Sequence, residues 1–71
     1  MNFAKKCREL RIKKAVTQEQ MAAALNLSSQ AISKWENGVT LPDITLLPEL
    51  SVYFGVTIDE LFDITDEKHL T

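Results

Sequence analysis

Apolar residues recur at the spacing of amphipathic helices along most of the chain. Phe3, Cys7 and Leu10 stand at i, i+4 and i+7, which predicts a first helix over residues 2–14. We interpret Cys7 as a core residue, because no His or second Cys is placed to make it a nucleophile or a ligand. Charged side chains cover most of the rest of this helix: Lys5, Lys6, Arg8, Glu9, Lys13 and Lys14.

Residues 17–38 are the centre of the pattern, which predicts two short helices joined by a tight turn. Thr17 and Gln20 have the spacing of a capping box. Asn26 tolerates the left-handed backbone that a tight turn needs, and Ser28 can cap the second helix. The apolar face of the first of these two helices consists of Met21, Ala22 and Leu25.

The second helix of this pair has two distinct faces. At about 100° per residue its polar members lie within an arc of about 140°: Ser29, Gln30, Ser33, Lys34 and Asn37. The opposite side carries Ala31, Ile32 and Trp35. We therefore expect Trp35 to pack in the core. The alternative role for an indole ring on such a helix is to stack on a nucleotide. Because the polar face has small and amide side chains, one cation and no acid, it suits contact with phosphates and base edges.

The second half of the chain predicts two further helices. Gly38 suits the C-cap of the preceding helix, and Pro42 marks a loop. Residues 43–46 should form an irregular or 3₁₀ segment that leads into a helix. That helix should begin at about Leu47, with Pro48 in its first turn, and end at Gly55. The inward residues of this helix should be Leu47, Leu50 and Phe54. Thr57 and Glu60 have the spacing of a second capping box, which should begin a short last helix. That helix would contain Ile58, Leu61 and Phe62.

The charge is divided between the two halves of the chain. Residues 1–40 have seven Lys or Arg against three Glu, a net charge of +4, whereas residues 41–71 have one Lys against seven Asp or Glu, a net charge of −6. A protein polarised in this way can present its basic side to DNA although the total is −2. The alternative is that the split arises by chance.

Size and cysteine content limit the remaining choices. Seventy-one residues make one domain at most. No apolar run approaches the length of a membrane span or of a signal-peptide core. A single cysteine cannot form an internal disulfide, which fits a reducing, cytoplasmic location.

Several motifs together resemble one known family. These are Val-Thr-Gln-Glu-Gln-Met-Ala at 16–22, Ile-Ser-Lys-Trp-Glu-Asn-Gly at 32–38, Leu-Pro-Asp-Ile at 41–44 and Phe-Gly-Val-Thr-Ile-Asp-Glu-Leu at 54–61. They are similar to the phage-repressor or Cro-type helix-turn-helix proteins, also called the XRE family, over about residues 3–62. The resemblance implies an all-α fold, a compact five-helix bundle of the lambda-repressor type. The chain departs from the family at Ala15, where Gly is usual.

The resemblance also implies an ion pair between Arg11 and Glu36, tying the first helix to the end of the second helix of the pair. Pairing would keep the acid from repelling DNA phosphates. The alternative is that Arg11 is an ordinary surface cation.

The function implied by the resemblance is sequence-specific binding of double-stranded DNA by a transcriptional regulator of repressor type. The helix over 29–37 would lie in the major groove. Gln18 and Asn37 should hold phosphates, Ser28 should contact the backbone, and Lys13 and Lys14 should add non-specific attraction. The expected base-facing residues are Ser29, Gln30, Ser33 and Lys34, with Gln30 suited to adenine and Lys34 to guanine. For each residue the alternative is an ordinary polar surface side chain.

Catalysis, cofactors and metals are not expected. The only His, His69, lies in the tail, two glycines cannot make a phosphate-binding loop, and the acids Asp59, Glu60 and Asp63 fit the start of a helix. The runner-up function is a protein-interaction module of antitoxin or antirepressor type.

We expect residues 1–62 to form the DNA-binding domain, and residues 63–71 to be either a tail or the start of a missing segment. On DNA a homodimer is expected, through Phe62, Ile64 or a region beyond residue 71.

Overall fold

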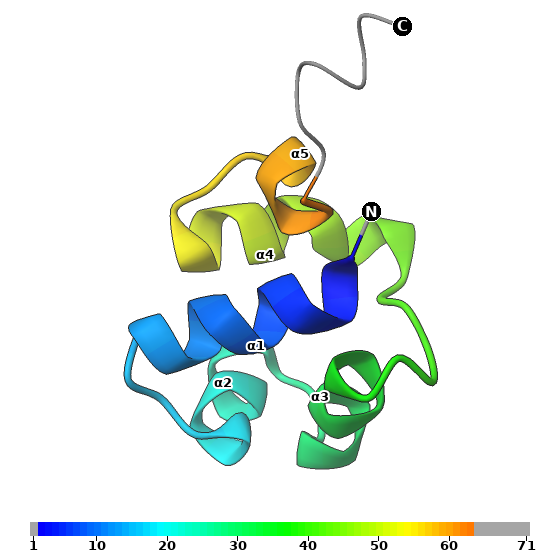
Figure 1. Cartoon of the computed structure of the whole chain (residues 1–71). Helices are drawn as coiled ribbons and strands as arrows, with labels where there is room; N and C mark the ends of the chain where they lie inside the picture. The colour runs from blue at the N-terminus through cyan, green and yellow to red at the C-terminus, as the bar shows by residue number, and fades with distance from the viewer. Residues whose placement is uncertain (1, 64–71) are drawn as a thin grey trace, which may run out of the picture.

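In the computed structural model, which describes residues 2–63, every regular element is helical (Figure 1). The helices are α1 (Phe3–Lys13), α2 (Gln18–Leu25), α3 (Ser29–Glu36), the 3₁₀ turn η1 (Ile44–Leu46), α4 (Leu47–Phe54) and α5 (Ile58–Leu61). The all-α, five-helix fold class is as predicted, including the 3₁₀ lead-in and the place of Pro48 in the first turn of α4. The predictions for Ile64, His69 and the rest of the tail lie outside the described residues.

Polar side chains begin the helices where the sequence predicts. The Thr17 hydroxyl accepts a hydrogen bond from the Gln20 backbone N–H at 3.0 Å, and the Gln20 side chain accepts one from the Thr17 N–H at 2.8 Å. Thr57 and Glu60 make the same reciprocal pair, at 3.1 Å each way. Ser28 caps α3 by accepting from the Ala31 N–H at 3.2 Å. These bonds satisfy backbone donors that a helix start otherwise leaves unpaired.

Each of the first four α-helices is followed, within two residues of its end, by a residue with a left-handed backbone. These residues are Ala15, Asn26, Gly38 and Gly55, with φ angles of 62°, 59°, 74° and 69°. In each case the N–H of the left-handed residue donates to the carbonyl three residues before it, and the next N–H donates to the carbonyl five residues before itself. This is the Schellman arrangement. Gly38 therefore lies one position beyond the C-cap, which is Asn37.

Helix α1 lies between the other two pairs of helices: α2 and α3 are on one side of it, and α4 and α5 are on the other (Figure 1). The buried core draws on all five helices: Phe3, Cys7, Met21, Ala22, Ile32, Trp35, Leu50 and Leu61. The Phe3 ring packs edge-on against Trp35, with centroids 6.1 Å apart, and against Phe62 at 5.4 Å. Trp35 is thus a core residue, as predicted.

None of the helices in the described part of the chain is long and apolar enough to cross a bilayer.

The left-handed backbone at Ala15 gives a stability prediction. An L-residue with a side chain pays about 1 kcal/mol more than Gly in this conformation. We expect Ala15→Gly to raise the free energy of unfolding by up to about 1 kcal/mol, measured by urea denaturation. The control is Ala23→Gly, exposed within α2, where loss of helix propensity should lower it by about 1 kcal/mol. A loss of stability in both variants would contradict the prediction.

A candidate nucleic-acid interface on the third helix

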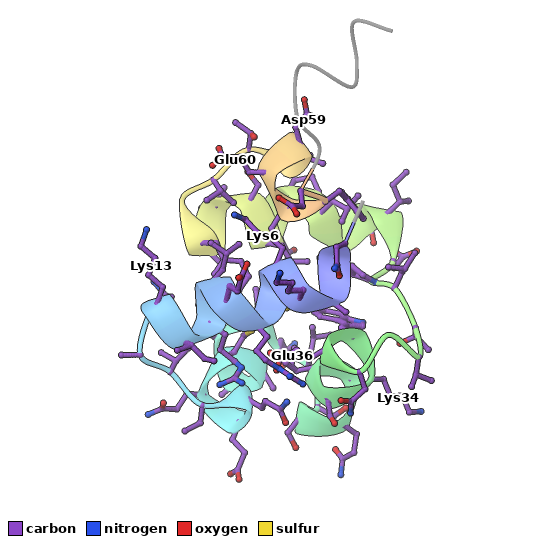
Figure 2. All side chains as sticks on the ribbon, viewed as in Figure 1. Lys6, Lys13, Lys34, Glu36, Asp59 and Glu60 are labelled. Carbon is purple, nitrogen blue, oxygen red and sulfur yellow. The ribbon has the colours of Figure 1, made fainter. Side chains whose placement is uncertain are left out.

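Helix α3 turns its polar side to solvent and its apolar side to the core. Gln30, Lys34 and Asn37 are exposed, and Ser29 and Ser33 are half-buried. On the opposite side Ile32 is fully buried and Trp35 is only 4% exposed. Figure 2 shows Lys34 projecting outward from α3. The structure therefore brings the five residues of the predicted polar face together on one surface.

Two of the polar groups near this surface are held by hydrogen bonds. The Asn37 side-chain amide donates to the Ser33 hydroxyl at 3.3 Å, which fixes Asn37 beside the exposed face of α3. Ser28 uses its hydroxyl oxygen as an acceptor for the Ala31 N–H. Its hydroxyl hydrogen is not used by that bond and can be donated to an anion.

The only acid of α3, Glu36, points away from the polar face and into the protein. Its side chain is fully buried, and its carboxylate accepts two hydrogen bonds from Arg11, from Nε at 2.7 Å and from Nη2 at 3.0 Å. Arg11 Nη1 also donates to the Val16 carbonyl at 3.0 Å. The ion pair that the family resemblance implies is thus present as a two-bond fork joining α1 to α3, and the surface-cation alternative is wrong for Arg11.

The Glu36 carboxylate is held ionised in spite of its burial. Burial by itself raises the pKa of a carboxyl, but the hydrogen bonds from Arg11 and Gln18 and the charges of Arg11 and Arg8 outweigh it and hold the pKa of Glu36 below its ordinary value.

The Cys7 thiol behaves in the opposite way. Burial, together with the Glu36 charge, raises the pKa of Cys7 to about 12 against a smaller opposing effect of Arg11, so Cys7 stays a neutral core thiol at neutral pH.

Gln18 has a partner that the sequence did not reveal. Its amide Nε2 donates to Glu36 Oε1 at 3.1 Å, so the side chain is oriented from α2 toward the end of α3. One amide hydrogen satisfies this bond and the second is left for another acceptor. The expected phosphate contact is therefore compatible with a fixed position of Gln18.

Lys13 and Lys14, at the end of α1, lie on its side toward α4. The Lys14 ammonium sits over the Tyr53 ring of α4, 4.8 Å from its centroid. Figure 2 shows Lys13 at the end of α1, pointing away from α2 and α3. Both residues line a hollow together with Phe54 and Gly55 at the end of α4. That this pair adds non-specific attraction to DNA stays a prediction.

A cation that the sequence analysis does not select, Arg8, lies near the buried carboxylate of Glu36. Arg8 Nε is 3.6 Å from Glu36 Oε1, and the Arg8 side chain is 51% exposed. The signal was present in the sequence, since Arg8 precedes Arg11 by three residues and so shares its side of the helix.

Comparison with known proteins agrees with this geometry. A family model described as helix-turn-helix matches residues 8–61. The chain belongs to the helix-turn-helix family. The resemblance noted from the sequence motifs is thereby confirmed.

Three relatives of this helix-turn-helix chain are named as transcriptional regulators. The HTH-type transcriptional activator BcrR of Enterococcus faecalis is 49% identical over 61 residues, which are 86% of this chain and 30% of BcrR. The cryptic phage CTXphi transcriptional repressor RstR of Vibrio cholerae is 29% identical over 83% of this chain and 53% of RstR. The uncharacterised HTH-type transcriptional regulator y4dJ of Sinorhizobium fredii is 39% identical over 93% of this chain and 80% of that protein. The chain thus spans about a third of BcrR and about half of RstR.

The fold is also that of a solved structure. The solution structure of the SOS-response transcriptional repressor LexA from Eubacterium rectale superposes with a TM-score of 0.82, covering 92% of this chain and 69% of the solved chain, at 22% identity. At 22% identity this similarity shows a shared fold and nothing more.

Removing one partner of the buried pair should be costly. We expect Arg11→Met to lower the free energy of unfolding at neutral pH by about 3 kcal/mol or more, because it leaves the buried Glu36 carboxylate without its main counter-charge. The measurement is urea denaturation followed by circular dichroism. The matched control is Arg8→Met, which removes a half-exposed cation and should cost less than about 1 kcal/mol. A loss below about half a kcal/mol for Arg11→Met would show that the pair contributes little to stability.

The lowered pKa of Glu36 predicts a specific pH dependence. A carboxyl whose pKa is lower in the folded state stabilises the fold above its ordinary value, 4.5, and loses that contribution as the pH falls through the folded value. We expect the difference in unfolding free energy between the natural protein and Glu36→Gln to be constant near neutral pH and to shrink below about pH 4.5. Comparing the two proteins cancels the titration of the other carboxyls. A difference that grows on acidification would refute this assignment.

Proposed function

We propose that this helix-turn-helix domain binds double-stranded DNA sequence-specifically, with α3 in the major groove, as the DNA-reading part of a transcriptional regulator. The observation that carries the proposal is the acid-free outer side of α3, whose one carboxylate, Glu36, is buried and paired. A helix presented in this way can enter a groove lined by phosphates without charge repulsion. The names of the relatives include both an activator and a repressor, so the proposal covers regulation without specifying activation or repression.

Base reading is assigned to four residues of α3. Gln30 and Lys34 are exposed and long enough to reach base edges, Gln30 with the paired donor and acceptor that adenine requires and Lys34 with donors for guanine. Ser29 and Ser33 are half-buried, so they are assigned close contacts at the groove wall. Three residues are assigned to the sugar–phosphate backbone: Gln18, Ser28 and Asn37. Their hydrogen bonds within the protein support these roles, because each is held in place with a donor to spare.

The charge distribution supports the same orientation. Figure 2 shows Asp59 and Glu60 at α5, on the opposite side of α1 from α3 and Lys34. These two acids of the second half of the chain therefore lie away from the proposed DNA surface, where they repel phosphates least.

We further propose that the DNA-binding unit is residues 1–62 and that it acts as a homodimer on two half-sites about 34 Å apart. Phe62 is a weak candidate for the dimer contact, because it is half-buried and packs against Phe3. The remainder of a longer regulator, of the length seen in BcrR, is then a better source of the dimer interface.

Selection of preferred sequences from random duplexes tests the proposal. The natural protein should enrich one sequence family, and Gln30→Ala should bind that sequence about fivefold to 150-fold more weakly, with relaxed preference at one base pair. The control is Glu49→Gln, an exposed change on α4, which should leave both affinity and preference unchanged.

Absence of DNA binding would favour the alternative function, a protein-interaction module of antitoxin or antirepressor type. If no duplex is bound at low salt, or if Gln30→Ala binds like the natural protein, the fold serves a protein partner instead of DNA.

A further inference from the structure

The structure divides the cations of the first half of the chain into two groups. Four of the seven are paired within the protein or point away from α3. Arg11 is paired with Glu36, Lys14 lies over Tyr53, Lys13 points away from α2 and α3, and Lys6 points toward α5 (Figure 2). In agreement, the charge of Lys6 is one of the influences that lower the pKa of Glu60, after its hydrogen bonds to Thr57. This leaves Lys5, Arg8 and Lys34, and Arg8 alone of these is held by the buried carboxylate.

Arg8 and Arg11 make unequal use of Glu36. Arg11 forms the two-bond fork, at 2.7 and 3.0 Å, and its side chain is 16% exposed. Arg8 approaches the same carboxylate only to 3.6 Å, beyond ordinary hydrogen-bond length. Because one carboxylate carries a single negative charge, the three groups together have a net charge of +1. The excess lies on Arg8, which is oriented by attraction to Glu36 but keeps most of its donors free.

Arg8 also lies beside a group already assigned to the DNA backbone. Glu36 Oε1 accepts the hydrogen bond from Gln18 Nε2 at 3.1 Å and is the oxygen that Arg8 Nε approaches. Gln18 of α2 therefore donates to the same buried oxygen that Arg8 of α1 approaches without a hydrogen bond, and this oxygen also accepts from Arg11 Nη2 at 3.0 Å. A guanidinium with free, forked N–H groups next to an amide N–H is a suitable binding site for one phosphate.

We propose that Arg8, together with Gln18, holds one DNA phosphate, and that Glu36 acts as a positioning residue for both. This inference rests on the proposed function and adds to it a contact that comes from α1. Glu36 then has two effects. It keeps its own charge out of the groove, and it restricts Arg8 before DNA arrives, which lowers the conformational entropy lost on binding.

The salt dependence of binding tests the proposal. The probes are two duplexes of equal length, one carrying the selected sequence and one of random sequence. For Arg8→Gln we expect the log–log slope of affinity against salt to become shallower by about 0.9, the value for one lost phosphate contact. Affinity should fall by a similar factor on both duplexes, because a phosphate contact has no base preference. Arg8→Lys, which keeps the charge, should restore most of the slope.

The matched control is Lys6→Gln, which removes the same charge from the other flank of the same helix and should change the slope much less. An equal change in Lys6→Gln, or an unchanged slope in Arg8→Gln, would overturn the inference. The inference also fails if Arg8→Gln lowers the free energy of unfolding while the slope stays as in the natural protein, since Arg8 would then serve only to balance Glu36. A natural protein that binds no duplex would instead overturn the proposed function, and the inference with it.

Discussion

The buried carboxylate of Glu36 is the interaction on which the arrangement of the first three helices depends. It accepts hydrogen bonds from Arg11 of α1 and Gln18 of α2 while belonging itself to the end of α3. A charge inside a small core is tolerated only when its oxygens are satisfied, and here the partners come from both helices that flank α3. The geometry of the pair therefore fixes the position of the polar face of α3 relative to the rest of the domain.

The same group links stability to the proposed function. If Glu36 were exposed, its charge would lie close to the polar face of α3, which is proposed to approach phosphates. Buried, it orients the Gln18 amide and attracts the Arg8 guanidinium, so a negative charge arranges the donors of the proposed phosphate contact. On the other side of α3, Ile32 and Trp35 supply the apolar contacts that hold this helix against the core.

Short helices in a chain of this length require defined ends. Side-chain caps start α1, α2, α3 and α5, and left-handed residues close the first four helices. Three of those closing positions have Asn or Gly, for which the conformation is cheap. Ala15 is the exception, and it adopts the conformation because the chain must reverse there to bring Val16 onto the core and α2 beside α3.

The sequence by itself determined the helices, their caps and the division of α3 into two faces, because periodicity and capping act over three or four residues within one turn of helix. It also indicated the Arg11–Glu36 pair, but only through the family motifs, since the two residues are 25 positions apart. Tertiary structure decided the rest. That Gln18 of α2 binds Glu36 of α3, that Lys14 turns to Tyr53 and that Arg8 is left with excess charge are all outcomes of contacts between helices. Such contacts depend on how the helices pack against one another, and no local pattern in the chain encodes them.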